Sequence, residues 1–146
     1  MKARTIIGIL VMMCVLAQVV YAGGRDDLKK YFSDTASKVK ATTETAQKRE
    51  TLSRSFQKMS NALDRVQSSP LISQEDRAGI DRFKATLQEK QDELAGLNGF
   101  ERVPDAQLNA FSDYVVQDME QAADRTITIS VVTALLIVIL LVLLLK

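Results

Sequence analysis

The apolar run from Ile127 to Leu145 constrains the fold of this chain more than any other feature. It holds about nineteen residues without a charge, mostly Ile, Val and Leu, and only Lys146 follows it. A helix of that length spans about 28 Å, close to the ~30 Å hydrocarbon core of a bilayer. A helix in a soluble core would keep a polar face, which this run lacks beyond its first turns. We therefore predict a transmembrane helix over 126–145.

The amino-terminal residues have the layout of a secretory signal peptide. Lys2 and Arg4 precede an apolar run of about fifteen residues, and small or branched residues precede the expected cleavage site after Ala22. We expect residues 1–22 to be removed, with an uncleaved signal anchor as the alternative. The basic amino end and Lys146 should both face the cytoplasm. The intervening domain is then extracytoplasmic, in a periplasm or a secretory lumen.

The segment between the two apolar ends, 23–125, reads as one small helical domain. Its apolar residues recur at steps of three and four, the spacing of helices that pack on a partner. We predict helices at about 26–67, 74–97 and 105–125. The expected buried positions are Leu28, Phe32, Ala36, Val39, Ala46, Leu52, Phe56, Met59, Leu63 and Val66 in the first, Ile80, Phe83, Leu87, Leu94 and Leu97 in the second, and Leu108, Phe111, Val115, Met119 and Ala122 in the third.

Turn-forming residues separate the predicted helices. Pro70 ends the first helix, because a residue before proline is pushed away from helical angles. Ser73 is placed to cap the second helix, and Asn98-Gly99 is a stop signal at its end. No breaker lies between Ala106 and Leu145. The third helix should therefore run without interruption into the membrane.

The fold class that follows is all-α, with two arrangements left open. In a three-helix bundle, the third helix runs antiparallel to the second and parallel to the first. In a long hairpin, the second and third helices run end to end along the first. Charge favours the first helix as neighbour to both others. It carries ten basic and six acidic residues from Arg25 to Val66, a net +4, against one basic and five acidic from Asp105 to Arg125, a net −4.

Composition excludes several kinds of site. The chain has no histidine, its one cysteine is Cys14 within the signal, and no glycine-rich phosphate loop is present. We therefore expect no enzyme activity, no metal and no cofactor. The net charge of +1 gives no reason to expect nucleic acid. Glu89, Asp92 and Glu93 lie within one helical turn, but a solvated helix face is the favoured reading of that cluster.

Two segments are candidate interaction sites. The first half of the first helix has a thin apolar seam, so we expect it to project from the bundle and bind a partner protein. The predicted contact residues are Leu28, Tyr31, Phe32 and Val39. In the membrane, Thr126, Ser130 and Ala134 are spaced four apart, a stripe of small residues that permits close helix approach and self-association into a homo-oligomer.

The expected function is that of a membrane-anchored helical adaptor or accessory subunit of a membrane complex. An alternative is an envelope-spanning tether. The layout is similar to that of single-chain phage spanins, which have a lipid at the front and a span at the back. This chain departs from that pattern, since Met13 rather than a small residue precedes Cys14. A bundle that binds a lipid or small ligand is a third hypothesis.

Overall fold

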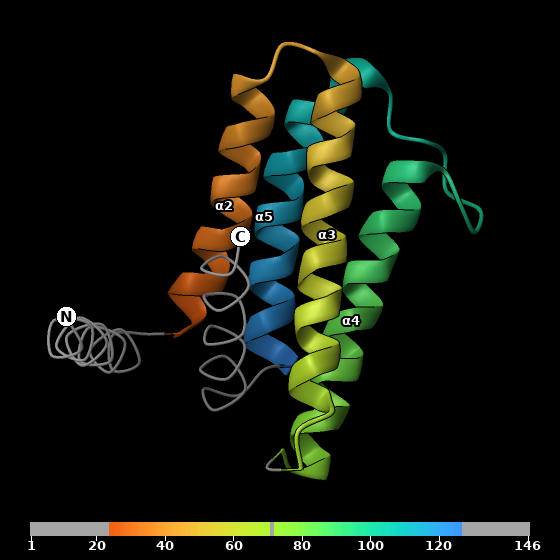
Figure 1. Ribbon diagram of the computed structural model, residues 1–146. Coiled ribbons are helices and arrows are strands. Elements are labelled where there is room, and N and C mark those ends of the chain that lie inside the picture. Colours follow the sequence, from red (N-terminus) through yellow and green to blue (C-terminus); the bar gives the residue numbers. More distant parts are fainter. Residues whose placement is uncertain (1–23, 71, 127–146) are drawn as a thin grey trace, which may run out of the picture.

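The computed structural model describes residues 24–70 and 72–126, which form a bundle of antiparallel helices (Figure 1). Its elements are α2 (Gly24–Ala41), α3 (Thr45–Gln67), α4 (Gln74–Ala95), η1 (Asp105–Gln107) and α5 (Leu108–Thr126). The predicted signal peptide and nearly all of the predicted transmembrane helix lie outside the described residues. Within the described ranges, no helix is both long enough and apolar enough to cross a membrane.

The four α-helices of this part of the chain alternate in direction, up, down, up and down. Each helix packs against the helix that follows it, and α2 closes the bundle by packing against α5. Short connections between antiparallel neighbours are typical of this topology. The prediction of an all-α fold is therefore confirmed, and the arrangement is a four-helix bundle.

The predicted first helix, 26–67, is wrong as a single element. It breaks at 42–44, and α2 folds back beside α3. The three-helix bundle and the long hairpin both required an unbroken helix, so neither arrangement is found. The break follows from burial: folding back covers the apolar face of α2, and this outweighs the helical hydrogen bonds lost at the turn. At the carboxyl end of α2, the hydroxyl of Thr42 donates to the carbonyl of Lys38 at 2.8 Å and so satisfies a group of the last turn.

The apolar seams are confirmed at nearly every predicted position. The buried members are Leu28, Phe32, Ala36, Val39, Leu52, Phe56, Met59, Leu63, Val66, Ile80, Phe83, Leu87, Leu94, Leu108, Phe111, Val115, Met119 and Ala122. Ala46 and Leu97 are the two exceptions, and both are exposed. Ala46 follows directly after the unpredicted break, and Leu97 lies beyond the observed end of α4.

The ends of α4 are set by a serine and a glycine. Ser73 is the predicted cap, and its Oγ accepts the amide of Asp76 at 3.1 Å. The carboxyl end was predicted too late, because α4 stops at Ala95 and Gly96 takes the left-handed conformation at φ 72°. Asn98-Gly99 forms the turn beyond that cap, with φ values of 53° and 88°. Leu97 is thereby released from the core.

Candidate functional site

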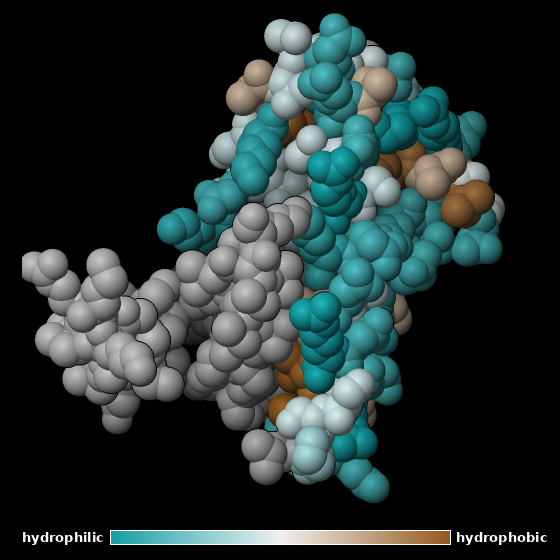
Figure 2. All heavy atoms as spheres, in the orientation of Figure 1, coloured by the Kyte–Doolittle hydropathy of each residue, from teal (hydrophilic) through white to brown (hydrophobic). Residues whose placement is uncertain are grey.

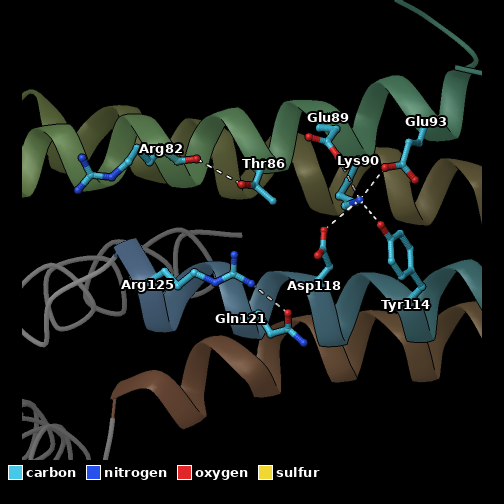
Figure 3. A network of polar contacts seen from close by, with 9 residues as sticks. All are labelled: Arg82, Thr86, Glu89, Lys90, Glu93, Tyr114, Asp118, Gln121 and Arg125. Carbon is cyan, nitrogen blue, oxygen red and sulfur yellow. Dashed lines mark hydrogen bonds and ion pairs between the residues drawn. The ribbon is translucent and has the colours of Figure 1, made fainter. Parts of the chain in front are cut away.

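Lys90 of α4 is a buried cation at the interface with α5. Its side chain is only 1% exposed. The ammonium Nζ donates to Glu93 Oε1 at 2.6 Å and to the hydroxyl of Tyr114 at 2.7 Å. It also lies 3.0 Å from Asp118 Oδ2, and Glu89 is a more distant neighbour at 3.7 Å. Figure 3 shows these side chains converging on Nζ from both helices.

The surroundings of Lys90 keep it charged. Burial by itself lowers the pKa of Lys90, but hydrogen bonds to Glu93, Tyr114 and Asp118 and the negative charge of Asp118 outweigh it, and the pKa is raised above its usual value. The ammonium also lies 4.3 Å from the centroid of the Tyr114 ring, a favourable cation–π distance. Its three hydrogens therefore all have partners.

Lys90 therefore has a structural role, in which it links α4 to α5. A protonated, fully hydrogen-bonded amine is neither a nucleophile nor a base. Its partners come from α4 at Glu93 and from α5 at Tyr114 and Asp118, so a slip of one helix along the other would leave a buried charge unpaired. The network therefore fixes the register of α5 against α4.

This network was not predicted from the sequence. In the sequence Lys90 only interrupts the apolar spacing between Leu87 and Leu94, and its partners on α5 lie more than twenty residues away in the chain. A lysine inside an apolar stripe, flanked by Glu89 and Glu93, was the available clue. The acidic cluster does not converge on one point. Glu93 contacts Lys90, whereas Asp92 accepts from Gln88 Nε2 at 3.0 Å and Asn98 Nδ2 at 2.9 Å.

The loop between α4 and α5, residues 96–104, is held in a defined shape. Arg49 of α3 donates to the carbonyl of Leu94 at 2.7 Å, to that of Val103 at 2.6 Å, and to Asp105 Oδ1 at 2.9 Å. Within the loop, the side-chain amide of Asn98 donates a hydrogen bond to the carboxylate of Asp92 in α4. These bonds anchor both ends of the loop to the bundle.

The same loop exposes two large apolar side chains. Leu97 is 55% exposed and Phe100 is 39% exposed. In Figure 2 the visible face is mostly hydrophilic; apolar atoms appear at the upper right, where Figure 1 shows this loop, and also at the lower centre. The loop lies at the same end of the bundle as residues 42–44, because Arg49 in the first turns of α3 binds it.

The predicted partner-binding residues lie in or against the core of the bundle. Leu28, Phe32 and Val39 are almost fully buried, so the expectation that this segment projects from the bundle is wrong. Tyr31 packs against the core and donates its hydroxyl to the carbonyl of Ser55 at 2.9 Å. Binding of a partner through these residues stays a prediction, and it requires α2 to leave its place.

Polar contacts add to the buried apolar face in docking the α2 helix. Thr35 Oγ1 and Ser55 Oγ are 2.9 Å apart in the α2–α3 interface. On the other side, Lys29 pairs with Glu120 at 3.1 Å and Lys40 with Asp113 at 2.5 Å. The basic first segment therefore does lie beside the acidic last one, as its charge predicted.

Of the predicted self-association stripe, Ser130 and Ala134 lie outside the described residues. Thr126 ends α5, and its hydroxyl donates to the carbonyl of Ala122 at 2.6 Å. Its own carbonyl approaches Gly79 of α4 so closely that a Cβ at Gly79 would lie 2.1 Å from the oxygen. The glycine therefore permits tight packing of the end of α5 on the start of α4.

Comparison with known proteins adds no relative. No protein-family model matches the chain, and no curated protein or solved structure matches it significantly. The site is interpreted from the chemistry of its own residues.

Proposed function

We propose that the protein is a single-pass membrane protein whose helical bundle, on the extracytoplasmic side, is an adaptor that binds another protein and carries out no catalysis. The supporting observation is that the apolar run Ile127–Leu145 begins directly after α5 ends at Thr126. In this proposal residues 1–22 are a cleaved signal peptide, 126–145 are the span and Lys146 is the cytoplasmic end. The contact between Gly79 and Thr126 then fixes the bundle relative to its anchor.

The partner surface that we propose is the loop 96–104, in place of the buried residues of α2. Leu97 and Phe100 are the apolar anchors, and their partner is a protein with an apolar pocket large enough for a phenyl ring. Arg49 holds the loop before binding, which reduces the entropy lost on association. The loop lies at the end of the bundle away from Thr126, where it is clear of the proposed membrane.

Anchoring is tested on native membranes. The protein should stay in the membrane fraction after alkaline carbonate washing, and protease added on the extracytoplasmic side should digest the bundle. Release by carbonate, or full protection from that protease, would contradict the proposal.

Partner binding is tested with a photo-reactive residue at Leu97 in the full chain, in its native membrane. We expect one discrete cross-linked product, lost when Phe100→Ser is added. The same photo-reactive residue at Ala85, which is exposed on α4, is the matched control. Equal products from both positions, or no product from Leu97, would count against the loop as the partner surface.

A further inference from the structure

We propose that α2 exchanges between two copies of this chain, with residues 42–44 as the hinge, to form a head-to-head dimer. In each subunit of that dimer, α2 and α3 form one straight helix from Gly24 to Gln67. The α2 half of each straight helix packs against α3 and α5 of the other copy. The partner is therefore a second copy of the same chain.

The hinge is poorly stabilised in its bent form. Glu44 is the residue at the amino cap of α3, and no side chain caps that end. The first amides of α3 lose helical partners at the break, and a straight helix would restore them. Residues 42–44 are Thr-Thr-Glu, with neither glycine nor proline, so nothing in the hinge forbids helical angles.

The docking face of α2 is transferable because, within the described residues, it packs against two other helices, α3 and α5. Tyr31 and Thr35 contact Ser55 of α3, and Lys29 and Lys40 contact Glu120 and Asp113 of α5. Exchange reproduces all of these contacts between copies. The straight helix is then gained without loss of these contacts among the described residues, which is the usual basis of domain swapping.

Geometry determines the shape of the dimer. The hinge and the loop 96–104 lie at one end of the bundle, and Thr126 lies at the other, beside Gly79 (Figure 1). A straight helix shared by two bundles therefore joins them at their hinge ends, where the exposed Leu97 and Phe100 of both copies also lie. The two Thr126 ends point away from each other. This last step rests on the proposed function: with a membrane span after each Thr126, such a dimer joins two facing membranes.

The exchange is tested by disulfide formation in trans. The full chain, in a Cys14→Ser background, is made with either Thr35→Cys or Ser55→Cys, whose hydroxyl oxygens are 2.9 Å apart. Co-expressed copies in mild detergent should form a disulfide-linked dimer after oxidation. The double variant on one chain, expressed alone, shows whether the pair can close within a chain. Copies with Gln67→Cys and Asp81→Cys are the collision control, since α3 and α4 stay in one bundle.

Hinge variants decide the interpretation. Glu44→Pro suits the bent form, where its φ is −76°, but breaks the interior of a straight helix. It should lower the dimerisation constant about ten-thousandfold, about a hundredfold for each of the two straight helices, while the closed chain still folds. Thr42→Ala/Thr43→Ala favours the straight helix and should raise the dimer yield. Equal yields in these variants, or no product between copies where the single-chain pair closes efficiently, would overturn the exchange.

Vesicles separate this exchange from the proposed anchor. Full chain reconstituted into two vesicle populations should cluster them, and Glu44→Pro should not. If disulfides form in detergent but the protein does not float with vesicles, the anchor fails and the exchange stands. If it floats but no copies cross-link, the exchange alone fails.

Discussion

At the residue scale, Lys90 is the clearest case of a buried charge that specifies how two helices pack and adds little to stability. Its ammonium is removed from water between α4 and α5 and is satisfied by Glu93, Tyr114 and Asp118. Desolvation of such a cation offsets most of what its partners contribute. The gain is therefore in specificity, because only one register of the two helices satisfies the charge.

Replacing Lys90 should cost little, whereas removing its partners should cost more. We expect Lys90→Met to change the free energy of unfolding by less than about 1.5 kcal/mol, because Glu93 and Asp118 stay partly exposed to water. Glu93→Ala/Asp118→Ala leaves the ammonium buried with one partner fewer on each helix and should cost about 3–5 kcal/mol. Urea unfolding measures both, and the reverse order of effects would contradict this role.

Stability should also fall in alkali. Burial raises the pKa of Tyr31, partly countered by its bond to Ser55, and the pKa of Lys90 is raised as well, from ordinary values of 10.0 and 10.5. Above pH 10 the unfolded chain loses these protons before the folded chain does, so the free energy of unfolding decreases. Below that pH both groups are protonated in the folded and the unfolded chain, so neither makes the free energy of unfolding depend on pH. Tyr31→Phe should flatten the loss that begins near pH 10, and an unchanged slope in urea unfolding would refute this.

At the scale of elements, the ends of helices decide how the bundle is assembled. Gly96 stops α4 early and turns Leu97 outward, and Arg49 holds the resulting loop. Gly79 lets α5 pack closely on α4. The hinge 42–44 has no such residue, so tertiary burial rather than local sequence bends the chain there.

Gly79→Ala tests the close packing of α4 and α5. Alanine is the better helix former by about 1 kcal/mol, so an open site would be stabilised. Here the added Cβ would lie 2.1 Å from the carbonyl of Thr126, and the end of α5 must move away. We expect a lower melting temperature for Gly79→Ala. Ala78→Gly, at an exposed neighbour, should show only the ordinary glycine cost. A rise in melting temperature for Gly79→Ala would contradict the contact.

At the scale of the whole molecule, sequence periodicity was enough to predict the fold class and most of the core. Such seams are local patterns, and residues such as Phe56, Phe83 and Met119 are buried as predicted. The number of helices was not predictable, because 42–44 contains no breaker. The Lys90 network was not predictable either, since it depends on which residues of α5 face α4. The exposed position of Leu97 follows from an end of α4 that lies two residues earlier than predicted.

In the closed chain α2 folds back into its own bundle, and one distance tests this most directly. Spin labels at Lys30 and Asn61, both exposed, are placed on the full chain in mild detergent, and the monomer, separated from any dimer by size, is measured so that only distances within a closed chain are read. Adjacent helices have axes about 8–10 Å apart, so the bent chain predicts a main label distance below about 25 Å. An unbroken helix predicts about 46 Å between these residues. A main distance near 46 Å in the monomer would contradict the fold.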